Sequence, residues 1–130
     1  MGEAIAKSRF EPALEVPLRD QIRKLSEAIN KRDLETIRTL ISPSRIFVEI
    51  GSKQGTYMSS SQTVAVVESF IRSRSAISTS FDFVTDDGQT GSASGMLSAV
   101  ESGRAVSYRL NFSFLRGANR EWLLSKITMK

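Results

Sequence analysis

The side chains that most often carry catalysis are missing from this sequence, whose 130 residues include no histidine and no cysteine. Zinc sites built from those residues, disulfides, cysteine nucleophiles and histidine-based triads are therefore excluded. Acid–base chemistry would have to rest on carboxylates, lysine, arginine or tyrosine, and a metal would need oxygen ligands. The composition thus restricts the mechanism before any element is assigned.

The run Asp86-Asp87-Gly88 suggests a calcium-binding loop at first sight. The ligand spacing of an EF-hand is missing, however. Acidic residues followed by glycine are typical of a hairpin turn. We therefore expect a turn here, and we predict neither a metal site nor a cofactor.

Positive charge is spread along the chain. The net charge is +4, and each half carries +2, from 10 basic and 8 acidic groups in residues 1–65 and 8 and 6 in residues 66–130. The basic pairs at residues 23–24, 31–32 and 72–74 are short and separated. A nucleic-acid-binding protein usually gathers such residues in a patch or stripe. We therefore favour solvent-exposed helix ends for these residues, and nucleic-acid binding is a second alternative function.

One domain is expected over residues 17–130. Pro12 and Pro17 interrupt the start of the chain, so residues 1–16 are expected to be a loose tail. No apolar run approaches the roughly 18 residues of a membrane span, and the start has no apolar signal core. An exported protein whose signal peptide has been removed would fit the same pattern, so the compartment stays open.

Three helices are predicted in the first part of this domain. Asp33 is the expected N-cap of the second helix, and Ser59 with Gln62 has the capping-box spacing for the third. The third helix ends near Arg72 and Arg74, which favour the negative end of a helix. The apolar positions at helical spacing are Leu18, Ile22, Leu25 and Ile29, then Leu34, Ile37, Leu40 and Ile41, then Val64, Val67, Phe70 and Ile71.

Strands are predicted at residues 45–50, 77–85, 92–100, 104–115 and 122–127. The clearest alternation lies in residues 104–115, and Gly95 suggests a bulge or a close approach of two backbones. The order is α-α-β-α-β-β-β-β. This order predicts an α+β fold in which three N-terminal helices pack on a curved, mostly antiparallel sheet.

The ordered elements resemble the nuclear transport factor 2-like superfamily, a cone-shaped fold shared with ketosteroid isomerase and scytalone dehydratase. The resemblance covers about residues 18–129. It is carried by the helix junction AINKRDL at 28–34, the first strand IFVEI at 46–50 and the closing strand WLLSKI at 122–127. The segment GTYMS at 55–59, with Gln62, further resembles a bacterial branch of unknown function.

What the resemblance implies about function is open, because this fold hosts isomerases, dehydratases, ligand carriers and interaction modules. The dehydratase-type mechanism relies partly on histidine, which is absent. An isomerase- or lyase-like enzyme would use a carboxylate base with a tyrosine, and the candidates are Glu49 or Asp82 with Tyr108. Strand alternation places both acids on the outer face. Glu49 lies on the opposite side of its strand from the apolar residues Ile46, Val48 and Ile50. Asp82 likewise lies on the opposite side of its strand from Phe81 and Phe83.

The favoured interpretation is therefore a non-enzymatic domain that binds a small apolar ligand or a protein partner. The residues expected to line the ligand cavity are Tyr57, Phe81, Phe83, Tyr108, Leu110, Phe112 and Trp122. The outer face of the sheet is expected to carry small polar residues such as Ser107, Arg109 and Asn111. Because relatives commonly dimerise through this face, the resemblance implies a homodimer.

Overall fold

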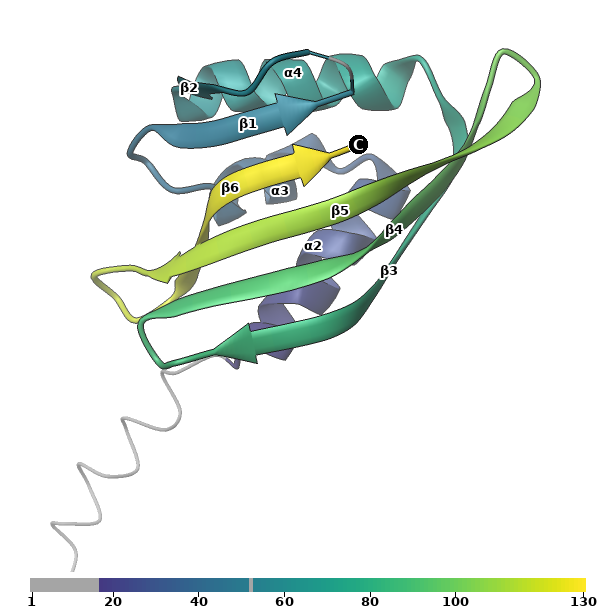
Figure 1. The fold of residues 1–130 in the computed structure, drawn as a ribbon. Coiled ribbons are helices and arrows are strands. Elements are labelled where there is room, and N and C mark those ends of the chain that lie inside the picture. Colours follow the sequence, from purple (N-terminus) through teal and green to yellow (C-terminus); the bar gives the residue numbers. More distant parts are fainter. Residues whose placement is uncertain (1–16, 52) are drawn as a thin grey trace, which may run out of the picture.

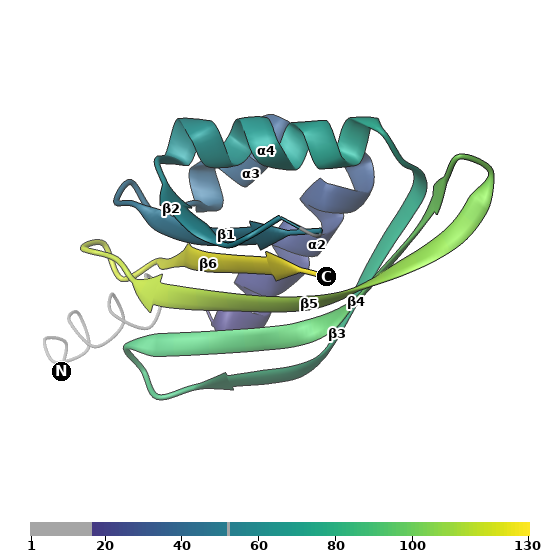
Figure 2. The same ribbon diagram turned by 45° about the horizontal axis from the view of Figure 1, so that its top comes forward.

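The helices and most strands occupy separate parts of the chain, and the helices pack on one face of a six-stranded sheet (Figures 1 and 2). The computed structural model describes residues 17–51 and 53–130, so the predicted tail at residues 1–16 lies outside the described residues. The elements are α2 (Leu18–Lys31), α3 (Leu34–Leu40), β1 (Ile46–Ile50), β2 (Thr56–Met58), α4 (Ser60–Arg72), β3 (Ser75–Asp86), β4 (Thr90–Glu101), β5 (Arg104–Arg116) and β6 (Trp122–Met129). The predicted α+β class is confirmed.

The two predicted helix caps are present. The Asp33 carboxylate accepts a hydrogen bond from the Thr36 backbone N–H at 3.2 Å, at the start of α3. At the start of α4, the Ser59 hydroxyl accepts from the Gln62 N–H at 3.2 Å, and the Gln62 side chain accepts from the Ser59 N–H at 2.9 Å. These contacts satisfy N–H groups that have no partner within the helix. Local sequence therefore sets where both helices begin.

The strands pair in the order β2-β1-β6-β5-β4-β3. The pairs from β3 to β6 are antiparallel hairpins, and β1 joins the sheet by pairing in parallel with β6. The short strand β2, antiparallel to β1, was not predicted, because residues 55–59 read as part of a turn and a cap. It extends the sheet by three residue pairs and leaves the order of the other elements unchanged.

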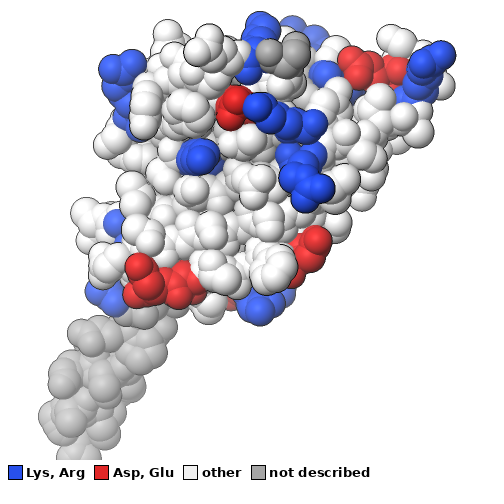
Figure 3. Space-filling view, viewed as in Figure 1, with Lys and Arg blue, Asp and Glu red and all other residues white. Residues whose placement is uncertain are grey.

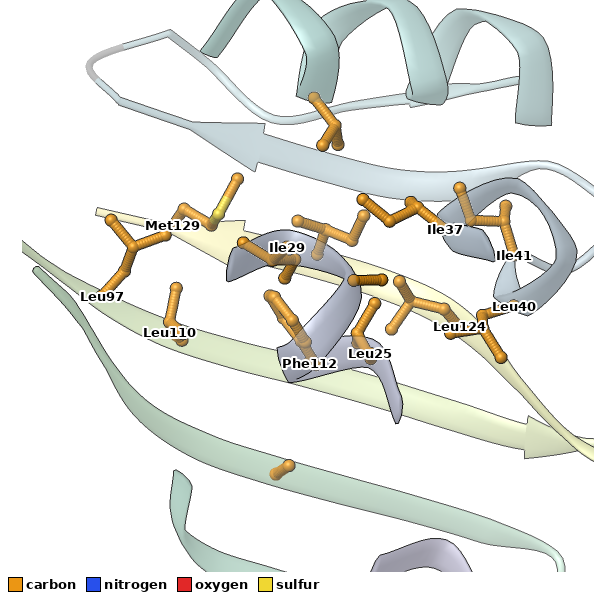
Figure 4. Packing of buried hydrophobic residues seen from close by; sticks show 14 of the residues in the cluster. Leu25, Ile29, Ile37, Leu40, Ile41, Leu97, Leu110, Phe112, Leu124 and Met129 are labelled. Atoms are coloured by element: carbon orange, nitrogen blue, oxygen red, sulfur yellow. The ribbon is translucent and has the colours of Figure 1, made fainter. Parts of the chain in front are cut away.

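The core lies between the helices and the inner face of the sheet, which is the face turned toward them. Figure 4 shows side chains of α2, α3, β4, β5 and β6 meeting in this layer. Leu25, Ile37 and Leu97 are fully buried there. A polar contact adds to the layer, since the Gln21 amide of α2 donates to the Trp122 carbonyl oxygen of β6 at 2.9 Å. None of the helices in the described part of the chain is long and apolar enough to cross a membrane.

A bulge in β3 overturns one prediction about the sheet faces. Phe81 pairs with Gly95 and Phe83 with Ser94, so Asp82 is an extra residue on β3. An extra residue reverses the alternation beyond it. Phe83 therefore lies on the outer face with 69% of its surface exposed, and Val84 packs against the core in its place. The expectation that Phe83 lines an inner cavity is wrong.

Gly95 occupies the close approach that its position suggested. A Cβ atom there would collide with the backbone of Ser80 and Phe81 on the neighbouring strand. The collision point is next to the bulge, so the glycine and the extra residue belong to one irregularity of the sheet. Together they let the long strands β3 and β4 curve around the helices (Figure 2).

Candidate functional site

A hollow with a volume of about 430 Å³ lies between α4, the end of β1, and Gly51 and Lys53. This volume is within the range of roughly 300–1,000 Å³ found for small-molecule sites. The described residues that line it are Ile50, Gly51, Lys53, Ala65, Val66, Ser69, Phe70, Ser73 and Arg74. Most of the lining comes from one helix and a strand end, which are rigid elements.

Helix geometry explains which residues of α4 reach the hollow. Positions three and four apart share one face of a helix, so Val66, Ser69 and Phe70 form a continuous strip, which the C-cap residue Ser73 extends. On the other side of α4, Val64 and Val67 face the core. The strip is therefore the flank of a helix whose opposite side is fixed by packing.

Arg74 closes one end of the hollow and carries the densest set of polar contacts there. Its Nε and Nη2 donate to the Tyr108 hydroxyl oxygen at 3.2 and 2.8 Å. Nη2 also lies 3.3 Å from Glu101 Oε2, and the Tyr108 hydroxyl donates to Glu101 Oε1 at 3.0 Å. We call Arg74, Glu101 and Tyr108 the polar cluster. It ties the end of α4 to the β4–β5 hairpin.

Three further contacts hold the Arg74 guanidinium in place. Nη1 donates to the Phe70 carbonyl oxygen at 2.9 Å and to the Ser73 hydroxyl at 2.8 Å. The guanidinium carbon lies 3.8 Å from the centre of the Phe70 ring, and that ring meets Tyr108 edge-to-face at 5.0 Å. The Arg74 side chain is only 12% exposed. The arginine therefore caps the carbonyl end of α4, as predicted, and in addition organises a partly buried cluster.

Arg32 supports the same corner from the helix side. It ends α2 in a left-handed backbone conformation, with φ of 59°. Its Nη1 and Nη2 donate to the carbonyl oxygens of Ile71 and Arg74, both at 2.7 Å. The ends of α2 and α4 are thus joined at the polar cluster.

Charge around the hollow is positive. Lys53 and Arg74 are among the described lining residues, and no aspartate or glutamate is. Among the described residues, the two carboxyl groups with clearly shifted pKa values, those of Asp33 and Asp87, lie elsewhere. Hydrogen bonds from Thr36 lower the pKa of Asp33, and backbone hydrogen bonds from Thr90 and Gln89 lower the pKa of Asp87. Both are structural, because Asp33 caps α3 and Asp87 forms the predicted turn between β3 and β4.

The residues predicted to line a cavity are distributed over three environments. Leu110, Phe112 and Trp122 are core residues with at most 2% exposure. Phe81 and Tyr108 pack at the margin of the core. Tyr57, on β2, is 60% exposed and contacts Phe47 edge-to-face at 5.3 Å. Of this set, Tyr108 reaches the neighbourhood of the hollow, through its bonds to Arg74.

The structure does not bring the candidate carboxylates to Tyr108. Glu49 alternates with buried residues of β1, and it forms an ion pair with Lys130 at 2.6 Å. Asp82 is exposed at the bulge of β3. The carboxylate that Tyr108 contacts is Glu101 instead. The arrangement required for a base at Glu49 or Asp82 with a tyrosine in one cavity is therefore missing among the described residues.

None of the described lining residues of the hollow was predicted as a site residue, and the charged groups missed in this way are Lys53, Arg74 and, in the polar cluster, Glu101. Glu101 lies between the strands predicted at 92–100 and 104–115, and Lys53 lies between the strand predicted at 45–50 and the third helix, so neither shows a periodic signal. An arginine just beyond a helix, with a tyrosine on the inner face of a later strand, was the available hint. In the described part of the chain, no group of three acidic residues could hold a metal ion.

The outer face of the sheet is a second candidate surface, and Figure 3 shows it as a largely uncharged area with one small group of adjoining basic side chains and several isolated basic spots. Its exposed apolar side chains are Tyr57, Phe83, Met96 and Leu115. Small polar residues such as Ser94 and Ser107 lie between them. A nucleic-acid site would require a continuous basic track, and the basic residues form no such track over this face in the figure.

Solved structures with the same fold are numerous, although no protein-family model matches the sequence and no curated protein does. A DUF4783 family protein from Bacteroides uniformis has a TM-score of 0.72 and 13% identity, over 83% of this chain and 94% of that one. An NTF-2 like protein of unknown function from Shewanella oneidensis has a TM-score of 0.69 and 10% identity, over 86% and 94%.

A third structure, from Streptomyces avermitilis, is provisionally described as a dehydratase of the NTF2-like family. It has a TM-score of 0.70 and 12% identity, over 86% of this chain and 91% of that one. At these identities the likeness shows the fold alone. The chain therefore has the nuclear transport factor 2-like fold that its sequence resembled, and its function must be argued from the site.

Proposed function

We propose that this chain is a non-enzymatic domain that binds a small, largely apolar ligand in the hollow beside α4. The observation that carries the proposal is the lining. Ile50, Ala65, Val66 and Phe70 supply its apolar part, and no carboxylate is among its described residues to act as a base. The polar cluster supports the same interpretation, because Tyr108 and Arg74 are bonded to each other and to Glu101.

A neutral apolar dye, N-phenyl-1-naphthylamine, tests this function. Its fluorescence rises in an apolar site, and we expect saturable binding to the wild-type chain. Ser69→Trp places a large ring in the hollow and is expected to weaken binding at least tenfold. The matched control is Ser61→Trp, on the same helix about 12 Å away along its axis.

Two results would count against the proposal. One is the absence of saturable dye binding to the folded wild-type chain. The other is equal weakening by Ser69→Trp and Ser61→Trp, provided that both variants unfold at the wild-type temperature. Either result would mean that the hollow is not where an apolar molecule binds.

The exposed apolar side chains on the outer face of the sheet suit contact with a second copy of this chain. Phe83, Met96 and Leu115 are 69%, 38% and 46% exposed, which is high for large apolar side chains. They stand among small polar residues that can approach a second sheet closely. Such a mixture suits an interface with an apolar centre and hydrogen bonds around it. We therefore propose that the chain forms a homodimer through this face.

A further inference from the structure

We propose that the ligand of the hollow is an amphiphile with a single negative charge, whose anionic group pairs with Lys53 and whose apolar part lies against Val66 and Phe70. This inference rests on the proposed ligand-binding function and specifies its ligand class. Three observations carry it: the number of free donors on Arg74, the unbalanced charge of Lys53, and the position of that charge relative to the apolar lining.

Arg74 has no donor left for a ligand. A guanidinium has five N–H groups. In this structure Nε donates to Tyr108, Nη1 to Phe70 and Ser73, and Nη2 to Tyr108 and Glu101. Its charge is also balanced, since Glu101 Oε2 lies 3.3 Å away. Arg74 therefore shapes the wall of the hollow without offering a binding group.

Lys53 is the cation whose charge remains. It is exposed, and no carboxylate among residues 17–51 and 53–130 lies within ion-pair distance of it. The remaining lining residues are uncharged apart from Arg74. Because Glu101 balances the charge of Arg74, the charge of Lys53 leaves the hollow with one net positive charge. A ligand with one negative charge neutralises this positive charge, whereas a dianion would leave the site with a net negative charge.

The charge lies where the charged end of an amphiphile can stay in water. Lys53 is exposed, whereas Phe70 is buried and Val66 is half-buried. Burying an ionised group away from water is costly, and placing it beside an exposed lysine avoids that cost. The apolar part of the ligand then covers Val66 and Phe70. A neutral apolar compound would fit this part but would leave the lysine without a partner.

Displacement of N-phenyl-1-naphthylamine by decanoate and by decan-1-ol, at pH 7.5, tests the inference. The two compounds share a ten-carbon chain and differ in charge. Lys53→Gln is expected to weaken decanoate binding about threefold, the effect of losing one exposed ion pair, and to leave decan-1-ol binding unchanged. Lys53→Arg is expected to restore decanoate binding. Lys126→Gln, which alters a lysine of β6 outside the hollow, is the control and is expected to have no effect.

The outcomes separate the inference from the function on which it rests. If decan-1-ol displaces the dye and Lys53→Gln leaves decanoate affinity unchanged, the charge assignment is overturned and the apolar site stands. If Lys53→Gln weakens both compounds equally, Lys53 acts by shaping the hollow, and the assignment is overturned as well. If neither compound nor the dye binds the wild-type chain, the proposed function fails, and the inference fails with it.

Discussion

Replacing Tyr108 by phenylalanine removes one hydroxyl group from the polar cluster and leaves the aromatic ring in place. The hydroxyl oxygen accepts from Arg74 at 2.8 Å and 3.2 Å, and the hydroxyl donates to Glu101 at 3.0 Å. Without it, two N–H groups of a guanidinium that is 12% exposed and one carboxylate oxygen lose a partner. The edge-to-face contact of the ring with Phe70 can remain.

The size of the effect follows from the charges and the exposure. A hydrogen bond to a charged group contributes about 1.5–3 kcal/mol. The direct contact between Arg74 and Glu101 survives in the variant, and the Glu101 side chain is 39% exposed, so water can replace part of what is lost. Both features favour the lower end of the range. We therefore expect Tyr108→Phe to lower the free energy of unfolding by about 1.5 kcal/mol.

Urea unfolding followed by circular dichroism measures this change, with an unaltered m value as evidence that the unfolded state is the same. Tyr57→Phe is the matched control. Tyr57 is 60% exposed, and no hydrogen bond of its hydroxyl is present among the described residues, so we expect a change within about 0.5 kcal/mol. Equal effects of the two substitutions would refute the view that the hydroxyl of Tyr108 holds the cluster together.

Gly95→Ala is expected to lower the free energy of unfolding by about 1–3 kcal/mol, because the added Cβ would collide with the backbone of Ser80. The control Ser94→Ala, on the same strand, is expected to change the free energy of unfolding little. Equal urea midpoints for the two variants would contradict this prediction. Acid is expected to destabilise the chain as pH falls below about 4, because folding lowers the pKa values of Asp33 and Asp87. The stability that these two carboxylates add is fully present above their unfolded-state pKa values. It is lost as pH falls through their folded-state pKa values. Asp87→Asn should flatten the decrease in melting temperature between pH 5 and pH 2.5, and an unchanged slope would speak against a role for this carboxylate. Phe83→Glu should convert the proposed dimer to a monomer in sedimentation velocity, whereas Thr39→Glu on α3 should leave the mass unchanged; a wild-type chain that is monomeric at all concentrations would exclude the dimer.

Features set by neighbours in sequence could be predicted from the sequence. The caps at Asp33 and Ser59 need partners only three residues away, and both form as expected. The apolar spacing of α2 likewise identified Leu25 and Ile29 as core residues. Such signals are local, so one sequence contains all the information they require.

Features set by pairing between distant strands could not be predicted in the same way. No residue type in β3 marks the bulge at Asp82 in the sequence. The bulge reverses the alternation of the strand, and Phe83 is exposed as a result. The strand β2 has three residues and depends on pairing with β1. The local sequence pattern of β3 or of β2 does not indicate which strand it pairs with, or in which register.

The candidate site was predictable only in part for the same reason. Tyr108 was identified by its place on the inner face, but its partners Arg74 and Glu101 are 34 and 7 residues away in sequence. Their meeting depends on where α4 ends and on the register of the β4–β5 hairpin. The hollow itself lies beside α4, and none of the residues predicted to line a cavity is among its described lining residues.

The most direct test of ligand binding in the hollow is a titration followed by two-dimensional ¹⁵N–¹H NMR. The uniformly ¹⁵N-labelled chain is titrated with decan-1-ol, and the shift of each assigned amide signal is recorded. Binding in the hollow predicts saturable shifts at Gly51, Val66, Phe70 and Arg74, which line it, and small shifts at outer-face residues such as Ser107. Shifts that fail to saturate, or that gather on the outer face around Met96, would contradict the assignment of the hollow as the ligand site.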